Sequence, residues 1–230
     1  MAERKSAVSA LKKLKPVKYH TETFEKISEE KRDRIINAAL AEISAKGFTA
    51  ANINLIAKNA GISIGSMYQY FNAKEDLFLT VLDEGYRIIE RSLQEIDLVS
   101  GDIFDKLEQI LLHIQKYARE YRLLNQLYLE ATTQGLTHIS QKISLKLETI
   151  SSVFYQSIIR RGQEEGVVDK QIDPQTASFC IDNIILLLQF SYSSAYYRER
   201  MKIFAGEKAP EEDARIAREI MYFLRKALAP

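Results

Sequence analysis

The side chains with the clearest chemical use lie in a short segment that starts at Ser63. They are hydroxyls, an amide and phenols, groups that can hydrogen-bond DNA phosphates and base edges. Gly65 has no side chain, so a DNA strand can approach the backbone closely there. Lys74 adds a cation to the free N–H groups of a helix start, which favours a phosphate contact. The candidate DNA-binding residues are Asn52, Ser63, Gly65, Ser66, Tyr68, Gln69, Tyr70 and Lys74.

Two short helices joined by a tight turn are predicted to position these side chains. Asn52 is a good cap for the first helix, Gly61 supplies the turn, and Ser63 caps the second helix. Met67 and Phe71 are expected to point inward. Such a helix-turn-helix places the start of its second helix in the major groove. The bland alternative is that the two tyrosines of this segment are half-buried packing residues of a protein that never meets DNA.

The segment 47–77 resembles the tetracycline-repressor (TetR) family. The resemblance covers about the first third of the chain and is carried by the string Ile56-Ala57-x-x-Ala60-Gly61-Ile62-Ser63-x-Gly65-Ser66-x-Tyr68-x-Tyr70-Phe71-x-x-Lys74-Glu75-x-Leu77. It implies a dimeric repressor that a small molecule releases from operator DNA. Ala51 departs from the family, which often has a phosphate-binding threonine there, whereas Asn52 can still cap its helix.

The whole chain is predicted to be all-α. Only four Pro and nine Gly occur in 230 residues, and 46% of the residues are hydrophobic. The resemblance implies an N-terminal three-helix helix-turn-helix DNA-binding domain, joined by a long helix to a C-terminal helical ligand-binding and dimerisation domain. The domains expected are a flexible basic arm (1–27), the DNA-binding domain (28–76) and an effector-binding and dimerisation domain (77–230).

Capping residues and glycines set the expected helix boundaries. The first firm helix should run from Ser28 to Gly47, and a long fourth helix from Ala73 to about residue 96. Asp173 followed by a proline is a strong helix start. The later helices are expected at about 102–118, 121–132, 139–165, 174–198 and 211–228.

Charge is unevenly distributed along the chain. Residues 1–28 hold seven basic and three acidic residues, a balance of +4, whereas the chain as a whole is +1. The arm is therefore compatible with phosphate contact, and we hypothesise that it adds nonspecific DNA affinity. A solvated tail without any partner explains the same charges. Residues 28–76 hold six basic and six acidic residues, so their DNA affinity must come from arranged contacts.

No motif fixes a ligand in the larger domain, although the resemblance implies a pocket among its middle helices. The candidates are polar or aromatic residues on otherwise apolar faces, and each of them can instead fill the core or an interface. A pocket lined in this way would suit a largely apolar or aromatic effector with one or two polar groups. The candidate ligand-binding residues are His113, Tyr117, Gln126, Tyr128, Phe154, Tyr155, Asn183 and Gln189.

The last two predicted helices carry wide apolar faces. The resemblance implies that they pair with their copies in a homodimer, and two recognition helices ~34–36 Å apart would read a palindromic operator. The alternative is that these faces are buried within their own chain. The residues concerned are Phe179, Ile184, Leu187, Leu188 and Ser191 on one helix, and Ile216, Ile220, Phe223, Leu224 and Ala227 on the other.

Enzymatic chemistry finds little support in the sequence. The three histidines show no metal spacing, there is no nucleophile elbow or phosphate loop, and no cofactor or metal is expected. The single cysteine, Cys180, is expected to be a small core residue, in keeping with a reducing cytoplasm. The longest apolar run is too short for a membrane span. Besides a repressor, the sequence allows a DNA-binding protein of the same fold with an architectural or partner-controlled role and no small-molecule effector.

Overall fold

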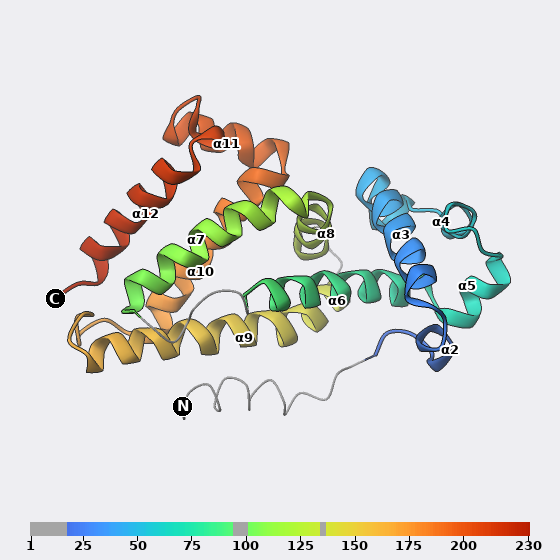
Figure 1. The fold of residues 1–230 in the computed structure, drawn as a ribbon, viewed down its shortest axis with the longest axis horizontal. Helices are drawn as coiled ribbons and strands as arrows, with labels where there is room; N and C mark the ends of the chain where they lie inside the picture. Colours follow the sequence, from blue (N-terminus) through green and yellow to red (C-terminus); the bar gives the residue numbers. More distant parts are fainter. Residues whose placement is uncertain (1–17, 94–100, 134–136) are drawn as a thin grey trace. The chain divides into compact units, whose positions relative to one another are not determined.

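A computed structural model describes residues 18–93, 101–133 and 137–230 of the chain (Figure 1). Within these ranges the regular structure is helical and contains no strand, which confirms the predicted all-α class. None of these helices combines the length and the apolar character that a membrane crossing requires. The helices are α2 (Glu22–Glu25), α3 (Glu29–Ala50), α4 (Ile53–Asn59), α5 (Ile64–Tyr70), α6 (Lys74–Leu93), α7 (Ile103–Glu120), α8 (Arg122–Thr133), α9 (Thr137–Glu164), α10 (Pro174–Ser193), α11 (Ala195–Ala205), the 3₁₀ helix η1 (Ala209–Glu211) and α12 (Asp213–Leu228).

Side-chain caps begin several helices where the sequence places them. The Ser28 hydroxyl accepts a hydrogen bond from a first-turn N–H of α3. The Asp102 carboxylate accepts two such bonds at the start of α7, and Asp173 accepts one at the start of α10. Gly47 adopts a left-handed φ of 77° inside α3, so the regular helix ends there as predicted and one further turn follows. Caps and glycines act locally, so the sequence alone reveals them.

The prediction of one helix over 174–198 is wrong, because the chain breaks at Ser194. This residue has an extended conformation (φ −110°, ψ 132°) between α10 and α11. Its N–H still donates to the carbonyl of Phe190 at 2.8 Å, and its carbonyl still accepts from the N–H of Arg198 at 2.9 Å. The break therefore leaves the main-chain groups of Ser194 satisfied, and it needs neither glycine nor proline.

The chain divides into two compact units. One contains the described residues of 15–89 and 123–140, and the other contains those of 90–122 and 141–230. In this division most of α6 and nearly all of α8 belong with the helix-turn-helix, whereas the sequence placed a domain boundary after residue 76. We call the first, which contains the helix-turn-helix that is expected to bind DNA, the DNA-reading unit, and the second the C-terminal unit.

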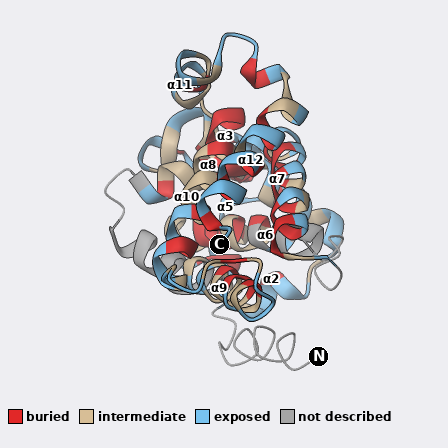
Figure 2. Cartoon of the chain, turned by 90° about the vertical axis from the view of Figure 1, so that its left-hand side faces the viewer, coloured by how far each residue is buried: buried red, intermediate tan, exposed pale blue. Residues whose placement is uncertain are grey.

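Each unit has its own apolar core, and Figure 2 shows buried and exposed residues side by side along single helices. In the DNA-reading unit the side chains of Ile35, Ile56, Met67, Phe71 and Phe78 are inaccessible to solvent. In the C-terminal unit a buried stripe of α7 packs with buried residues of α9, α10 and α12. Cys180 on α10 is exposed, so the expectation of a core cysteine is wrong.

Candidate nucleic-acid interface

The turn between α4 and α5 is built from the residues that the sequence singled out. The Asn52 side chain caps α4 by accepting from two backbone N–H groups, at 2.9 and 3.4 Å. Gly61 has a left-handed φ of 69°, and a Cβ there would meet open space, so glycine is needed for its backbone conformation alone. Ala57 and Ala60 are buried where α4 meets the turn. The helix-turn-helix geometry is thus fixed by caps, small residues and one positive φ.

Helix α5 has one buried face and one exposed face. Met67 and the following Phe71 have no exposed surface, which confirms that they point inward. On the other face Ser63, Gly65 and Gln69 are exposed, and 54% of Tyr68 is accessible. The exposed face therefore offers hydroxyl, amide and phenol groups beside a bare backbone at Gly65, a set able to meet base edges and phosphates.

Ser63, which precedes α5, and Ser66 hold the first turn of this helix together. The Ser63 hydroxyl accepts from the N–H of Ser66 at 3.1 Å, and the two hydroxyl oxygens lie 2.9 Å apart. Ser63 is exposed and Ser66 is partly buried. Each hydroxyl retains hydrogen-bonding capacity beyond this pair, because a hydroxyl has one donor and two acceptor positions.

Tyr70 does not belong to the exposed face, contrary to the prediction. Only 4% of it is accessible. Its ring centroid lies 5.9 Å from that of Phe24 and 6.5 Å from that of Phe71, and the Lys31 ammonium lies 5.5 Å from its ring. Tyr70 is therefore a core residue of the DNA-reading unit.

The partner of Tyr70 comes from a segment that the sequence analysis assigned to the flexible arm. Residues 18–27 contain α2, and Phe24 of α2 is buried. The Thr21 hydroxyl donates to the carbonyl of Gln69 at 2.7 Å, and the Thr21 N–H donates to that of Tyr70 at 3.0 Å. These bonds satisfy two carbonyls at the end of α5 that have no partner within the helix. Phe24, an aromatic residue in an otherwise polar stretch, was the signal in the sequence that this part of the arm packs against the domain. The rest of the predicted arm, residues 1–17, lies outside the described residues.

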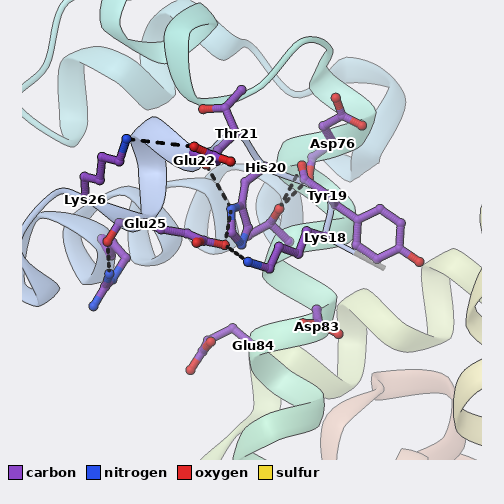
Figure 3. A network of polar contacts seen from close by, with 12 residues as sticks. Lys18, Tyr19, His20, Thr21, Glu22, Glu25, Lys26, Asp76, Asp83 and Glu84 are labelled. Carbon is purple, nitrogen blue, oxygen red and sulfur yellow. Dashed lines mark hydrogen bonds and ion pairs between the residues drawn. The ribbon is translucent and has the colours of Figure 1, made fainter. Parts of the chain in front are cut away.

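Polar side chains tie the same segment together (Figure 3). The Lys18 ammonium lies 2.5 Å from the Glu25 carboxylate, and the Nδ1 atom of His20 lies 3.9 Å from it. The hydrogen bond from Lys18 lowers the pKa of Glu25. The Thr80 hydroxyl donates to the carbonyl of Asp76 in its own helix at 2.7 Å and lies 3.2 Å from the carbonyl of Tyr19, so α6 contacts this segment.

Lys74 has an internal role in the structure. Its ammonium donates to the carbonyls of Thr49 and Ala51, at 2.9 and 3.2 Å, and lies 4.9 Å from the Phe48 ring centroid. An ammonium has three N–H donors, so one remains for a phosphate. The predicted phosphate contact stays a prediction, and closing the turn between α3 and α4 is the role that the structure describes.

The eight candidate ligand residues are divided between the two units, and their role in ligand binding stays a prediction. Gln126 and Tyr128 lie on α8 of the DNA-reading unit, and the other six lie in the C-terminal unit. There Tyr117 and Tyr155 are buried, and burial raises the pKa of both phenols. The Asn183 amide donates to the Phe179 carbonyl of its own helix at 2.7 Å, which satisfies part of a group that we expected to reach a ligand.

The remaining ligand candidates are partly buried. His113, Phe154 and Gln189 all fall in this class, and the Nε2 atom of His113 is buried without a hydrogen-bond partner among the described residues. Asp182 was not among the candidates predicted from the sequence, and its pKa rises to about 6 because it is partly buried and because Glu148 adds a second negative charge. Among the described residues no group of three His, Cys, Asp or Glu side chains could hold a metal ion.

Residues 35–81, which include the whole helix-turn-helix, match the family model "Bacterial regulatory proteins, tetR family". An uncharacterised HTH-type transcriptional regulator, YhgD of Bacillus subtilis, is 22% identical over 170 residues, which are 74% of this chain and 88% of that protein. The fatty acid metabolism regulator protein of B. subtilis is 28% identical over 151 residues, which are 63% of this chain and 74% of the relative.

Solved structures share the fold. The structure of a TetR family transcriptional regulator from Chloroflexus aurantiacus has a TM-score of 0.68 and 22% identity, and the match covers 92% of this chain and 99% of that one. The structure of the regulator FadR from B. subtilis in complex with stearoyl-CoA has a TM-score of 0.65 and 21% identity, covering 84% and 96% of the two chains.

Proposed function

Because this chain is a transcriptional regulator of the tetR family, we propose that it is a dimeric repressor which a small molecule releases from a palindromic operator. The observation that carries the DNA-binding part is the exposed face of α5. Tyr68 and Gln69 stand out from a helix whose opposite face is buried, and Gly65 keeps the approach to its backbone open. In this proposal Tyr68 and Gln69 meet base edges, while Ser63, Ser66 and Asn52 meet phosphates.

Exposed aromatic residues support the dimer. On α10 and α12 of the C-terminal unit, 68% of Phe179 and 62% each of Tyr222 and Phe223 are accessible. Large aromatic side chains are enriched at the centres of protein interfaces. The predicted faces are buried only in part by their own chain, since Leu188 and Ile216 are buried whereas Phe179 and Phe223 are not. We propose that a second copy of the chain covers this remaining apolar surface.

Cys180 offers a direct test of the dimer, because it is exposed on α10 beside Phe179. A two-fold axis near α10 would bring two copies of this thiol together, so mild oxidation should give a covalent dimer that dithiothreitol reverses. Sedimentation velocity on Cys180→Ser would show whether the dimer forms without the bond. A monomer at micromolar concentration would contradict the proposal.

We propose a largely apolar effector for the C-terminal unit. Support for this chemistry comes from the similar fatty acid metabolism regulator of B. subtilis and from the structure of B. subtilis FadR, which was solved with stearoyl-CoA. Stearoyl-CoA, with coenzyme A as the matched control, is therefore a suitable first probe. A rise of the melting temperature with the acyl form alone would support an apolar effector. Effectors that are all compact and highly charged would contradict it.

The DNA-binding part is tested by selecting duplex sequences from a random pool with the full chain at a fixed salt concentration. A recovered palindrome would support a dimeric regulator. Folded protein that selects no sequence would contradict the proposal and would favour an architectural or partner-controlled role.

A further inference from the structure

The turn over residues 47–52 connects α3 to the helix-turn-helix and so determines where α4 and α5 lie. Gly47 turns the chain with its left-handed φ of 77°, Ala51 is buried, and Asn52 caps α4. A displacement of this turn moves the start of α4 and, through the short α4–α5 turn, the recognition helix. The contacts that hold the turn therefore also position the recognition helix α5.

Three helices hold this turn. From α3, the Glu42 carboxylate accepts from the N–H of Asn52 at 3.2 Å. From α6, the Lys74 ammonium donates to two carbonyls of the turn. From α8, the Glu130 carboxylate accepts from the N–H of Phe48 at 2.5 Å. Glu130 is the member of this set that lies far away in the sequence, 82 residues after Phe48.

Gly47 has a positive φ and also lies close to the Glu130 side chain. A Cβ atom at Gly47 would lie 2.8 Å from the Oε1 atom of Glu130, which is closer than real Cβ contacts come. The carboxylate thus occupies the space that a side chain would need. The positive φ favours glycine here, and a side chain at this position would in addition have to displace the carboxylate end of Glu130.

Further contacts join α8 to the same unit. The Ser44 hydroxyl donates to the carbonyl of Leu123 at 3.4 Å, and a Cβ at Gly85 would lie 3.0 Å from the Leu124 side chain. Leu127 and Ala131 have no exposed surface. The helix starts at Arg122, and Tyr121 alone separates it from the end of α7, so the chain passes directly from the C-terminal unit into α8.

We propose that Glu130 is a positioning residue for DNA binding, holding the turn over residues 47–52 so that a shift of α8 is transmitted to the recognition helix. This inference rests on the proposed function. Gln126 lies one helical turn before Glu130 on the same face of α8. A ligand that touches Gln126 would therefore act one helical turn away from the contact between Glu130 and the N–H of Phe48.

The expected loss of operator affinity follows from the fraction of molecules that are in the DNA-binding conformation. If only about a tenth of the molecules hold the turn in place once the carboxylate is removed, the apparent Kd for the operator rises about tenfold. Glu130→Ala should show this loss, while alanine favours the helix itself. Glu130→Gln keeps an oxygen that can accept from Phe48 and should stay within about threefold of the wild type.

The test measures operator affinity by fluorescence anisotropy, using the duplex that the wild-type chain selects and a fixed salt concentration. The variants are Glu130→Ala, Glu130→Gln and the matched control Glu120→Ala, which removes an exposed carboxylate at the end of α7. We expect about tenfold weaker binding for Glu130→Ala, rescue by glutamine, and no change for the control. Equal affinities of Glu130→Ala and the wild type would overturn the inference.

Two further readouts separate positioning from a loss of fold. Glu130→Ala should cost less affinity in a Gly47→Ala background, because that substitution already displaces the carboxylate, and the double-mutant cycle measures this difference. Hydrogen exchange at the Phe48 amide should accelerate at least tenfold in Glu130→Ala, and unchanged exchange would overturn the inference without any use of DNA. A wild-type chain that selects no duplex would instead refute the proposed function.

Discussion

The DNA-reading unit and the C-terminal unit differ in how well the roles of their residues could be predicted from the sequence. In the former, Asn52, Gly61 and Ser63 each perform the local role that their residue types indicate. In the latter, the predicted ligand residues are buried in the core, partly buried, or bonded within their own helix, as Asn183 is. A helix-turn-helix is built from contacts close in sequence, whereas a pocket depends on side chains brought together by tertiary packing. Substitutions in each unit test how far this contrast holds.

The largest effect is expected from Phe71→Ala. Phe71 has no exposed surface, and its ring centroid lies 4.9 Å from that of Phe24. Removing such a ring leaves a cavity and should lower the free energy of unfolding by about 3–5 kcal/mol. Urea titration of the full chain measures this. A loss below ~1 kcal/mol would mean that the inner face of α5 is not packed as described.

Tyr68→Ala should separate binding from stability on the same helix. Because 54% of Tyr68 is exposed, its removal should change the free energy of unfolding by no more than about 0.5 kcal/mol. Operator affinity should fall by roughly 1–3 kcal/mol, or tenfold to a hundredfold, if the phenol meets the bases. Urea titration and fluorescence anisotropy on the same preparation give both numbers. Unchanged affinity would place Tyr68 outside the interface.

Tyr192→Phe examines a polar network in the C-terminal unit. The phenol donates to the Asp213 carboxylate at 3.1 Å and accepts from the Gln115 amide at 3.0 Å, and burial raises the pKa of Tyr192 to about 12. Removing the hydroxyl should cost about 1–2 kcal/mol of stability. Operator affinity, measured well below the melting temperature, should stay the same. A large affinity change would show that the two units are less independent than their separate cores indicate.

The smallest effect concerns pH and Asp182. Its pKa is about 6 in the folded chain against an ordinary value of 3.8, so the stabilisation from binding the proton is present below 3.8 and disappears as the pH rises through 6. The free energy of unfolding of Asp182→Asn, relative to that of the wild type, should therefore be on the order of 1 kcal/mol higher at pH 8 than at pH 4.5, after allowance for solvent screening. Urea titrations at both pH values measure this difference. If the stability difference between the variant and the wild type were the same at both pH values, the pKa of Asp182 would be close to its ordinary value.

The features found from sequence share a local origin. Ser28 and Asp173 cap their helices because a short polar side chain can reach N–H groups two or three residues ahead. Tyr70 was misjudged because its burial depends on Phe24, which is 46 positions earlier in a stretch that reads as polar. The exposure of Cys180 is likewise decided by how α10 packs. The contact from Glu130 to Phe48 has no sequence signal, since a single acid on a helix has many possible partners.

The specificity ratio of Gln69→Ala tests most directly whether α5 reads sequence. The ratio compares the affinity for the selected operator with that for a scrambled duplex of equal length and composition, at one salt concentration. If the amide contacts a base, Gln69→Ala loses roughly 1–3 kcal/mol of affinity for the operator and none for the scrambled duplex, so the ratio falls. An unchanged ratio in a folded variant would contradict a base contact by α5 through Gln69.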